Sequence, residues 1–321
     1  MVFNLAFSDI FKYTFAKLKT NQEIKEIVIN SYGNVLLADE SVSIFEKNKA
    51  VLEKTLSDTK QIFKNGLIEE ENVEQLQITL ASVNSALANV KRQKTIAVNM
   101  LKLILGINLD NELILTEKLE ELTQKNVDLL LLQEEFKATN TIDYQIGENL
   151  QESKRLLLKY EKSKELPSLG AALNYGYNAF ENKFNFFSKD QKWNNFANFG
   201  VSLNVPIFSS LGSSARKQQA KIALEQATTK LTETEQNLKL QFEKARSDYE
   251  FTIEEFATNK NNLKLAERIE TKQQVKFKEG LSTSFNLSEA QRQLYTAQQT
   301  YLQSMVDVIN KKATLEKLIN K

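Results

Sequence analysis

A long stretch in the C-terminal part of the chain places apolar or small residues in steps of three, four or their sum, the spacing that aligns side chains on one face of a helix. These positions are Leu224, Ala227, Leu231, Leu238, Phe242, Ala245, Tyr249 and Phe256. Residues 213–277 contain neither Pro nor Gly, so the pattern predicts one helix over this whole range. At 1.5 Å per residue such a helix is roughly 100 Å long. This length favours a coiled-coil-like seam over an ordinary helical bundle.

The chain resembles itself at a shift of 214 positions. Residues 63–67 read Phe-Lys-Asn-Gly-Leu, and residues 277–281 read Phe-Lys-Glu-Gly-Leu. The register continues without gaps through Asn72 and Asn286, Gln77 and Gln291, and Leu101 and Leu315. We therefore expect a two-fold repeat in which each copy is a pair of antiparallel helices joined by a turn, because Gly commonly caps the end of a helix.

The turns of the two copies are predicted near residues 63–67 and 277–284, and the second is followed by a return helix over 285–319. The candidate tip residues are Lys64, Asn65, Gly66 and Leu67 in the first copy, and Lys278, Glu279, Gly280, Leu281 and Ser282 in the second. Gly66 and Gly280 are expected in left-handed backbone conformations.

Period-two alternation replaces the helical pattern between Pro167 and Gly212 and predicts strands over 168–177 and 196–208. The apolar alternate positions are Leu169, Ala171, Leu173, Tyr175, Phe199, Val201, Leu203 and Val205. Strands of about 9 to 11 residues suffice to cross a bilayer when tilted, so we expect this face to meet lipid. The alternative is a soluble hairpin that packs its apolar face on a helix.

The remaining segments complete the predicted organisation. Residues 1–106 form a partial first repeat, residues 107–140 an inter-repeat equatorial segment, and residues 141–321 the second repeat. We expect a short strand over 112–115, a leucine-rich helix over 127–136 and a helix over about 141–165. The loop between the strands carries an aromatic group that would suit a membrane interface: Phe180, Phe184, Phe186, Phe187 and Trp193.

Composition restricts the chemistry. Lys and Arg number 42 against 41 Asp and Glu, a balance that gives no overall field for nucleic acid. The chain has no Cys and no His, which removes thiolate nucleophiles, disulfides, imidazole bases and the commonest transition-metal ligands. We expect no cofactor, no metal and no catalytic residue. An enzyme would depend on carboxylates such as Glu69–Glu71 or Glu254 and Glu255, but acidic runs beside a helix start are usually solvated turns.

The order of these elements resembles the outer-membrane efflux protein family, the TolC-like ducts of Gram-negative envelopes. The matching segments are Glu165–Leu169 at the entry to the first strand, Val201–Phe208 at the exit from the second, the Phe-Lys-x-Gly-Leu turn of both tips, and Leu105-Gly106. The resemblance covers the chain from about Ile24 onward.

This resemblance implies a mainly α fold, with long antiparallel coiled-coil-like helices in an α-helical barrel and a membrane β-hairpin that contributes to a trimeric β-barrel. It implies a homotrimer in the Gram-negative outer membrane, with the helices in the periplasm and the strands in outer-membrane lipid. The expected function is that of a passive channel component of a tripartite efflux pump or a type I secretion system. Its partners would be a periplasmic adaptor protein, bound at the tips, and an inner-membrane pump.

The chain also departs from the family, whose members carry two strand hairpins in each protomer. Only one hairpin is intact here, and Phe3, Leu5 and Phe7 are expected to be the remnant of a lost strand. Residues 1–19 show no leader peptide. We therefore expect an N-terminally truncated chain, either a fragment or a degraded copy, which conducts nothing by itself. The alternatives are a soluble coiled-coil scaffold, which detergent dependence would distinguish, and a non-functional truncated paralogue.

Overall fold

The computed structural model describes residues 2–180, 192–208 and 211–320, with side chains from residue 13 onward. The chain divides into two compact units. The first unit comprises Met1–Thr14 and Ile146–Thr234, and the second comprises Phe15–Gln145 and Glu235–Lys321. Most of the described chain is helical. The predicted division at residues 106 and 140, which follows the repeat, stays a prediction.

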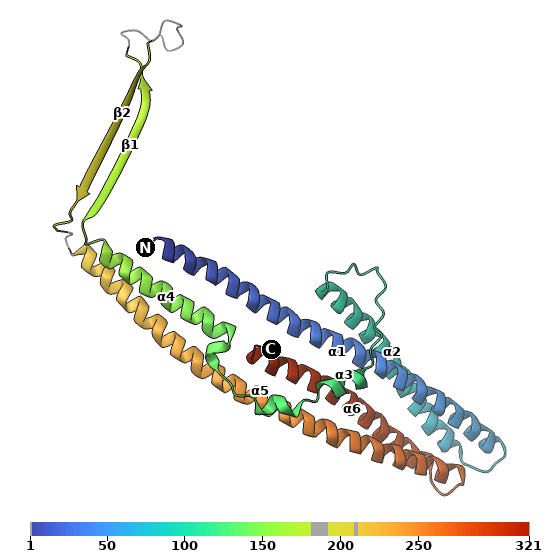
Figure 1. Ribbon diagram of the computed structural model, residues 1–321. Helices are drawn as coiled ribbons and strands as arrows, with labels where there is room; N and C mark the ends of the chain where they lie inside the picture. The colour runs from blue at the N-terminus through green and yellow to red at the C-terminus, as the bar shows by residue number, and fades with distance from the viewer. Residues whose placement is uncertain (1, 181–191, 209–210, 321) are drawn as a thin grey trace. The chain divides into compact units, whose positions relative to one another are not determined.

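Four long helices make up most of the chain (Figure 1). Helix α1 spans Val2–Lys64 and α5 spans Gly212–Lys278, while α2 (Glu70–Ile104) and α6 (Ser284–Leu318) have 35 residues each. The last residues of α1 and α5, and both ends of α2 and α6, coincide under the 214-residue shift. The caps after α2 and α6 also coincide, because Gly106 and Asn320 both have positive φ, at 70° and 60°. The sequence repeat is therefore a repeat of backbone structure.

The expected strand remnant near the N-terminus is wrong. Phe3, Leu5 and Phe7 lie in α1, which is helical from residue 2. Three alternating apolar residues are too few to specify a strand. Neither Pro nor Gly occurs before Gly33, so nothing in this part of the sequence interrupts the helix.

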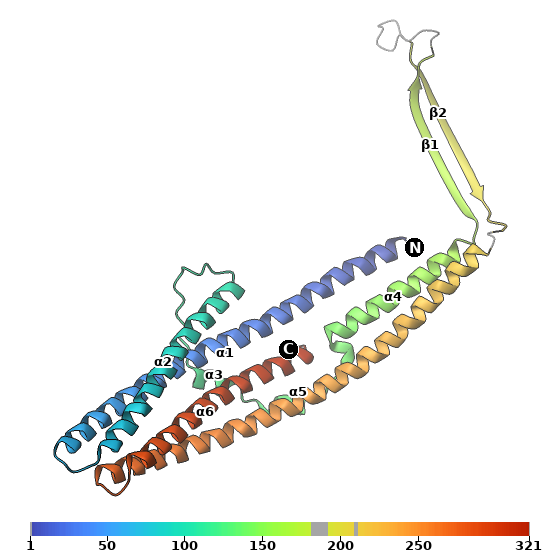
Figure 2. The ribbon, with the colours of Figure 1, turned by 180° about the vertical axis from the view of Figure 1, so that it is seen from behind.

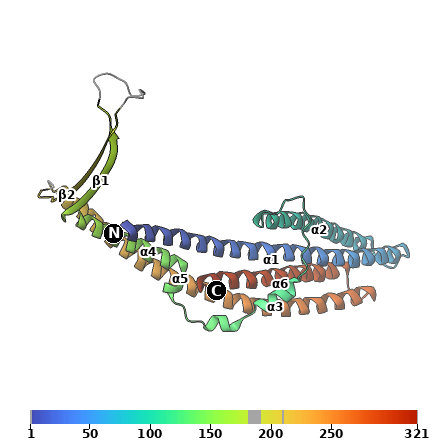
Figure 3. The ribbon, with the colours of Figure 1, turned by 45° about the horizontal axis from the view of Figure 1, so that its top comes forward.

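Helix α6 is the central element of the second unit and lies between α1 and α5 in Figures 1 and 3. Val306 is fully buried in an apolar cluster with Leu36 of α1 and Leu119 of α3 (Leu119–Asn126). Val308 is fully buried in a second cluster with Phe242 of α5. Residues two apart on a helix point in nearly opposite directions, so α6 is enclosed from both sides.

The inter-repeat segment differs from its prediction. Residues 112–115 form no strand, and 127–136 contain only a short 3-10 helix, η1 (Leu129–Gln133), followed by η2 (Ala138–Asn140). Of the four consecutive leucines that begin at residue 129, only Leu131 is fully buried, in the cluster beside α5. A strand also needs a hydrogen-bonded neighbour, and in the described ranges the only ladder joins β1 to β2.

Tyr249 of α5 ties this segment to the helices. Its side chain is fully buried, and its hydroxyl donates to the carbonyl of Asn126 at 2.6 Å and accepts from the N–H of Asp128 at 2.9 Å. Nearby, the rings of Phe136 and Phe242 stack with centroids 4.6 Å apart. These long-range contacts, and not local periodicity, determine the path of the segment.

The first unit carries the strand hairpin on a pair of helices. Helix α4 (Ile142–Ser163) ends shortly before Pro167, close to the predicted end. It packs closely on α5, since a Cβ added at Gly147 would lie 3.0 Å from the Leu231 side chain. Strands β1 (Ser168–Asn178) and β2 (Asn194–Asn204) follow and form the two-stranded antiparallel sheet.

We predict that Tyr249→Phe lowers the free energy of unfolding by about 1–3 kcal/mol, because the partly buried carbonyl of Asn126 and N–H of Asp128 lose their hydrogen bonds to the hydroxyl. Urea denaturation followed by circular dichroism measures this. Tyr160→Phe is the matched control, because that ring is partly exposed. Equal stability of Tyr249→Phe and the unaltered protein would contradict the anchoring role.

Candidate functional site

The hairpin register places the predicted apolar residues opposite one another. Leu169 faces Leu203, Ala171 faces Val201, and Leu173 faces Phe199 across the antiparallel ladder. Facing residues of a ladder point to the same side of the sheet, so these six side chains form one apolar face. Tyr175, which faces Ala197, extends it. Seven of the eight predicted residues therefore share one face of the sheet.

The eighth predicted residue, Val205, lies outside the strand, because β2 ends at Asn204 and not at 208. Pro206 follows directly and has no N–H to donate to a ladder. The predicted first strand, in contrast, agrees with β1 to within one residue.

The apolar face is exposed along its length. Leu173 is 75% exposed, and Leu169, Phe199, Val201 and Leu203 are also exposed. The opposite face is small and polar, with Gly170 facing Ser202 and Asn174 facing Asn198. The soluble alternative required a helix packed over the apolar face, and no helix of the described chain buries these side chains.

Aromatic residues flank the open end of the hairpin. Phe180 and Trp193 are both exposed. The other members of the predicted aromatic group, Phe184, Phe186 and Phe187, lie outside the described residues. The expectation of an aromatic girdle therefore stays a prediction.

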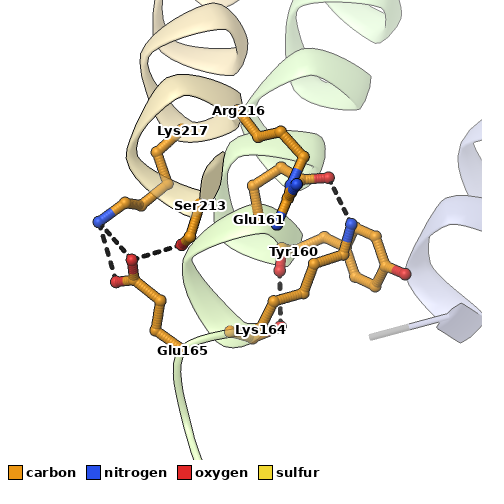
Figure 4. A network of polar contacts seen from close by, with 8 residues as sticks. Tyr160, Glu161, Lys164, Glu165, Ser213, Arg216 and Lys217 are labelled. Atoms are coloured by element: carbon orange, nitrogen blue, oxygen red, sulfur yellow. Dashed lines mark hydrogen bonds and ion pairs between the residues drawn. The ribbon is translucent and has the colours of Figure 1, made fainter. Parts of the chain in front are cut away.

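A polar clamp joins the helices at the base of the hairpin (Figure 4). The Glu165 carboxylate lies 2.7 Å from the Lys217 ammonium and accepts from the Ser213 hydroxyl at 2.6 Å. Glu161 lies 2.7 Å from Lys164 and 3.6 Å from Arg216. The hydrogen bond from Lys217, and then that from Ser213, hold the pKa of Glu165 below its usual value.

This clamp connects the end of α4 with the start of α5, so it fixes the two points where the chain enters and leaves the hairpin. In the sequence, Glu165 stands out only as the first residue of the segment Glu165–Leu169, which resembles the family. Its partners Ser213 and Lys217 lie about fifty residues away and carry no signal in the sequence.

The two tips adopt the same capped turn. Gly66 and Gly280 have φ of 73° and 72°, as the sequence predicts. The Leu67 N–H donates to the Ile62 carbonyl at 3.3 Å, and the Leu281 N–H donates to the Lys276 carbonyl at 2.8 Å. With the bonds from Gly66 to Phe63 and from Gly280 to Phe277, each turn is a Schellman motif.

Both turns present a leucine to solvent, because Leu67 and Leu281 are each 73% exposed. Figure 2 shows the two turns at the same end of the second unit. Lys64, Asn65, Lys278 and Glu279 are exposed around these leucines, whereas Ser282 is partly buried and donates to Gln273 at 3.0 Å. The structure thus places the predicted tip residues in two neighbouring turns.

Side chains that no sequence motif marks also join the two tips. The Ser284 N–H donates to the Asn72 side chain at 3.2 Å, and the hydroxyls of Thr79 and Ser288 lie 3.0 Å apart. Glu270 accepts a hydrogen bond from Gln291, but burial is the larger effect and raises the pKa of Glu270.

The carboxylates considered above lie at the start of α2 and on α5. Glu70 and Glu71 lie in the first turn of α2, where the helix dipole favours negative charge. Glu254 and Glu255 lie on α5. In the part of the chain that the structure describes, no group of three or more acidic residues is arranged to hold a metal ion. No described helix combines the length and apolar character needed to cross a membrane.

Part of the sequence and the whole fold are similar to known proteins. Residues 152–321, more than half of the chain, match the family described as outer membrane efflux protein. No curated protein sequence matches. Among solved structures, the chain is similar to CusC, at a TM-score of 0.83 and 16% identity, over 98% of this chain and 72% of CusC.

Two further solved structures have the same fold. VceC of Vibrio cholerae matches with a TM-score of 0.79 and 15% identity, over 98% of this chain and 74% of VceC. The MtrE outer membrane channel of Neisseria gonorrhoeae matches with a TM-score of 0.78 and 16% identity, over 98% of this chain and 70% of MtrE. At these identities the likeness establishes the fold, and it confirms the predicted class of long helices with a small antiparallel sheet.

We predict that the clamp at Glu165 weakens in acid. A carboxyl whose folded pKa lies below its unfolded value near 4.5 stabilises the folded state above that value and loses this contribution as pH falls through the folded pKa. Urea midpoints measured between pH 7 and pH 3 should fall more steeply for the unaltered chain than for Glu165→Gln. Lys217→Met should flatten the profile in the same way. Parallel profiles for all three proteins would contradict the clamp.

Proposed function

The chain belongs to the outer membrane efflux protein family, and from this premise we propose that it is a component of a passive export channel across the Gram-negative outer membrane. The channel would serve a tripartite efflux pump or a type I secretion system. The observation that carries it is the hairpin, whose apolar face is continuous, exposed and opposed to a small, polar face.

We propose that the apolar face meets outer-membrane lipid. Each strand has 11 residues, the length that a tilted strand needs to cross the hydrocarbon. The lipid-facing residues would be Leu169, Ala171, Leu173, Tyr175, Phe199, Val201 and Leu203, with Val205 at the membrane boundary. The small and polar face would then border the aqueous path, as in other membrane strands.

Two strands cannot satisfy their own backbone in lipid. Each has an outer edge whose N–H and C=O groups need partners, at a cost of several kcal/mol for each group left bare in hydrocarbon. Strands from further copies would supply these hydrogen-bond partners. Membership of the family implies that three copies of the chain assemble. The helices would then lie in the periplasm, where they lead substrate toward the membrane.

The tips are proposed as the docking site for a periplasmic adaptor protein, which would link the channel to an inner-membrane pump. The exposed Leu67 and Leu281 support this assignment. An apolar side chain held on a rigid turn loses little conformational freedom on binding, which suits it to anchor a partner. Lys64, Asn65, Gly66, Lys278, Glu279, Gly280 and Ser282 would form the rest of the docking surface.

Leu173→Arg tests the lipid-facing assignment. If Leu173 lies near the bilayer midplane, the arginine should cost about 2–4 kcal/mol and reduce the fraction of protein in the outer membrane. Membrane fractionation measures that fraction. Asn174→Arg, on the opposite face, is the control and should still insert. Equal insertion of both variants would show that the faces are misassigned.

Leu281→Asp combined with Leu67→Asp tests the tips. Both side chains are exposed, so the chain should fold normally while cross-linking to the adaptor declines. Leu130→Asp is the control, because Leu130 is similarly exposed but lies in the inter-repeat segment. Undiminished cross-linking of the double variant would exclude the tips as the docking site.

A further inference from the structure

Charge is distributed unevenly along the first unit. Residues 166–180 and 193–215, which include both strands, contain no charged side chain. The residues that directly flank these stretches, 159–165 and 216–221, hold eight charges, of which six are basic and two are acidic. The basic residues are Lys159, Lys162, Lys164, Arg216, Lys217 and Lys221, and the acidic ones are Glu161 and Glu165. We call these two segments the basic collar.

The excess of positive charge is confined to the collar. Beyond it, residues 146–158 hold two acidic and two basic residues, and residues 222–234 hold two acidic residues and one basic residue. The whole chain has a net charge of only +1. The helix ends next to the hairpin therefore carry a local positive potential that is not apparent from the overall composition.

Ion pairs inside the collar leave part of this charge uncompensated. The clamp shown in Figure 4 already uses both carboxylates, each of which lies 2.7 Å from a lysine of the collar. Lys159 and Lys162 are exposed and form no ion pair with any residue that the structure describes. Positive charges gathered at the end of a helix pair repel one another, and an anionic partner would relieve that repulsion.

Large apolar side chains are exposed in the segments that join the hairpin to the collar. Ile207 is 95% exposed and Phe208 is 82% exposed, shortly after the end of β2. Leu166, just before β1, and Leu211, just before α5, are exposed as well. No described residue buries these side chains. In the sequence they lie between the apolar face of the hairpin and the charges of the collar.

Leu211 occupies a position that usually holds a polar residue. Its carbonyl accepts the first hydrogen bond of α5, from the Ala215 N–H at 3.0 Å, so Leu211 is the N-cap of that helix. N-caps are commonly Ser, Thr, Asp or Asn, whose side chains accept from the first N–H groups of the helix. Leu211 has no such atom, and its φ of 64° is uncommon for residues other than Gly. The requirements of the helix therefore do not account for an exposed leucine here.

Exposed apolar side chains bordered by lysine and arginine are typical of protein surfaces at a membrane interface. The apolar groups enter the boundary between headgroups and hydrocarbon, while long basic side chains extend to the lipid phosphates. We propose that the basic collar, together with Leu166, Ile207, Phe208 and Leu211, binds the headgroup layer on the helix side of the membrane and prefers anionic phospholipids. The proposal rests on the proposed membrane role of the hairpin and adds the recognition of a lipid class.

Two observations favour lipid as the occupant. The first is continuity, because only Leu166 and Pro167 separate the collar from the start of β1. If the strands cross the hydrocarbon, the collar lies at the level of the headgroups. The second is charge complementarity, because the uncharged strands suit hydrocarbon, whereas the positive collar is attracted to a negative lipid surface. The collar would then determine how deeply the hairpin sits in the bilayer.

Vesicle flotation with the purified full chain tests the proposal. The probes are vesicles of phosphatidylcholine alone and vesicles in which part of this lipid is replaced by phosphatidylglycerol. We expect tighter binding to the anionic vesicles, and this preference should decrease as the salt concentration rises, because ions screen the charges. Equal binding to both kinds of vesicle would overturn the proposal.

Lys159→Gln combined with Lys162→Gln identifies the residues responsible. Neither lysine belongs to the clamp, so the chain should fold normally. Binding to the anionic vesicles should weaken roughly fivefold for each lysine removed, whereas binding to the neutral vesicles should not change. Lys244→Gln combined with Lys272→Gln is the matched control, because it removes the same charge from exposed positions of α5 outside the collar. Equal losses in the two double variants would contradict the role of the collar.

Phe208→Ser examines the apolar part of the surface. This variant should bind less tightly to both kinds of vesicle, because the apolar contact does not depend on lipid charge. Leu130→Ser is the control, because Leu130 is also exposed but lies in the inter-repeat segment. A loss of binding as large for Leu130→Ser as for Phe208→Ser would exclude the apolar contact at the base of the hairpin.

Trp193 reports insertion of the hairpin separately, because it is the only tryptophan of the chain and directly precedes β2. Its fluorescence emission should move to shorter wavelength when the far end of the hairpin leaves water. This shift in both kinds of vesicle, without a preference for anionic lipid, would overturn the collar proposal and leave the channel role intact. An anionic preference that depends on Lys159 and Lys162, without any shift for Trp193, would count against the lipid-facing hairpin alone.

Discussion

The backbone edges of the hairpin impose the strongest physical constraint on this protein. Strands β1 and β2 pair with each other over 11 positions, and within the described ranges no third strand pairs with either outer edge. An isolated two-stranded hairpin is marginal even in water, and bare edges in hydrocarbon cost far more. The Glu165 clamp and the close α4–α5 packing hold the base of this element, whose outer edges have no ladder partner among the described residues.

The two shorter repeated helices, α2 and α6, lie in different environments. Helix α6 is enclosed, while its repeat counterpart α2 is open along the equivalent surface. Gln291 of α6 is almost fully buried, yet Gln77 at the equivalent position of α2 is exposed. The duplicated helices therefore share a backbone but not an environment, and their side chains have diverged accordingly.

The sequence was sufficient to predict those elements whose backbone conformation depends on neighbouring residues in the chain. The period-two alternation predicted the shared face of β1 and β2, and the shifted glycines predicted both Schellman turns, because backbone conformation at those positions depends on the residue itself. The path of residues 107–140 was not predictable, since it depends on Tyr249 and Phe242 more than a hundred residues away. Strand β2 ends at Asn204, before the predicted residue 208, because Pro206 has no N–H to donate to a ladder. The partners of Glu165, Ser213 and Lys217, could not be predicted, because ion pairs and hydrogen bonds between distant residues produce no periodic pattern in the sequence.

The two tips differ in sequence, and this difference bears on how many partner molecules one chain could bind. Their backbones are the same, but Leu67 is followed by the acidic run Glu69–Glu71, whereas Leu281 is followed by the hydroxyl residues Ser282–Ser284. A partner with a single kind of contact site can match one tip well and the other only poorly. Such a partner would bind once per chain and leave every second tip free. Occupancy of both tips requires either two different contact modes on one partner or two different partners side by side.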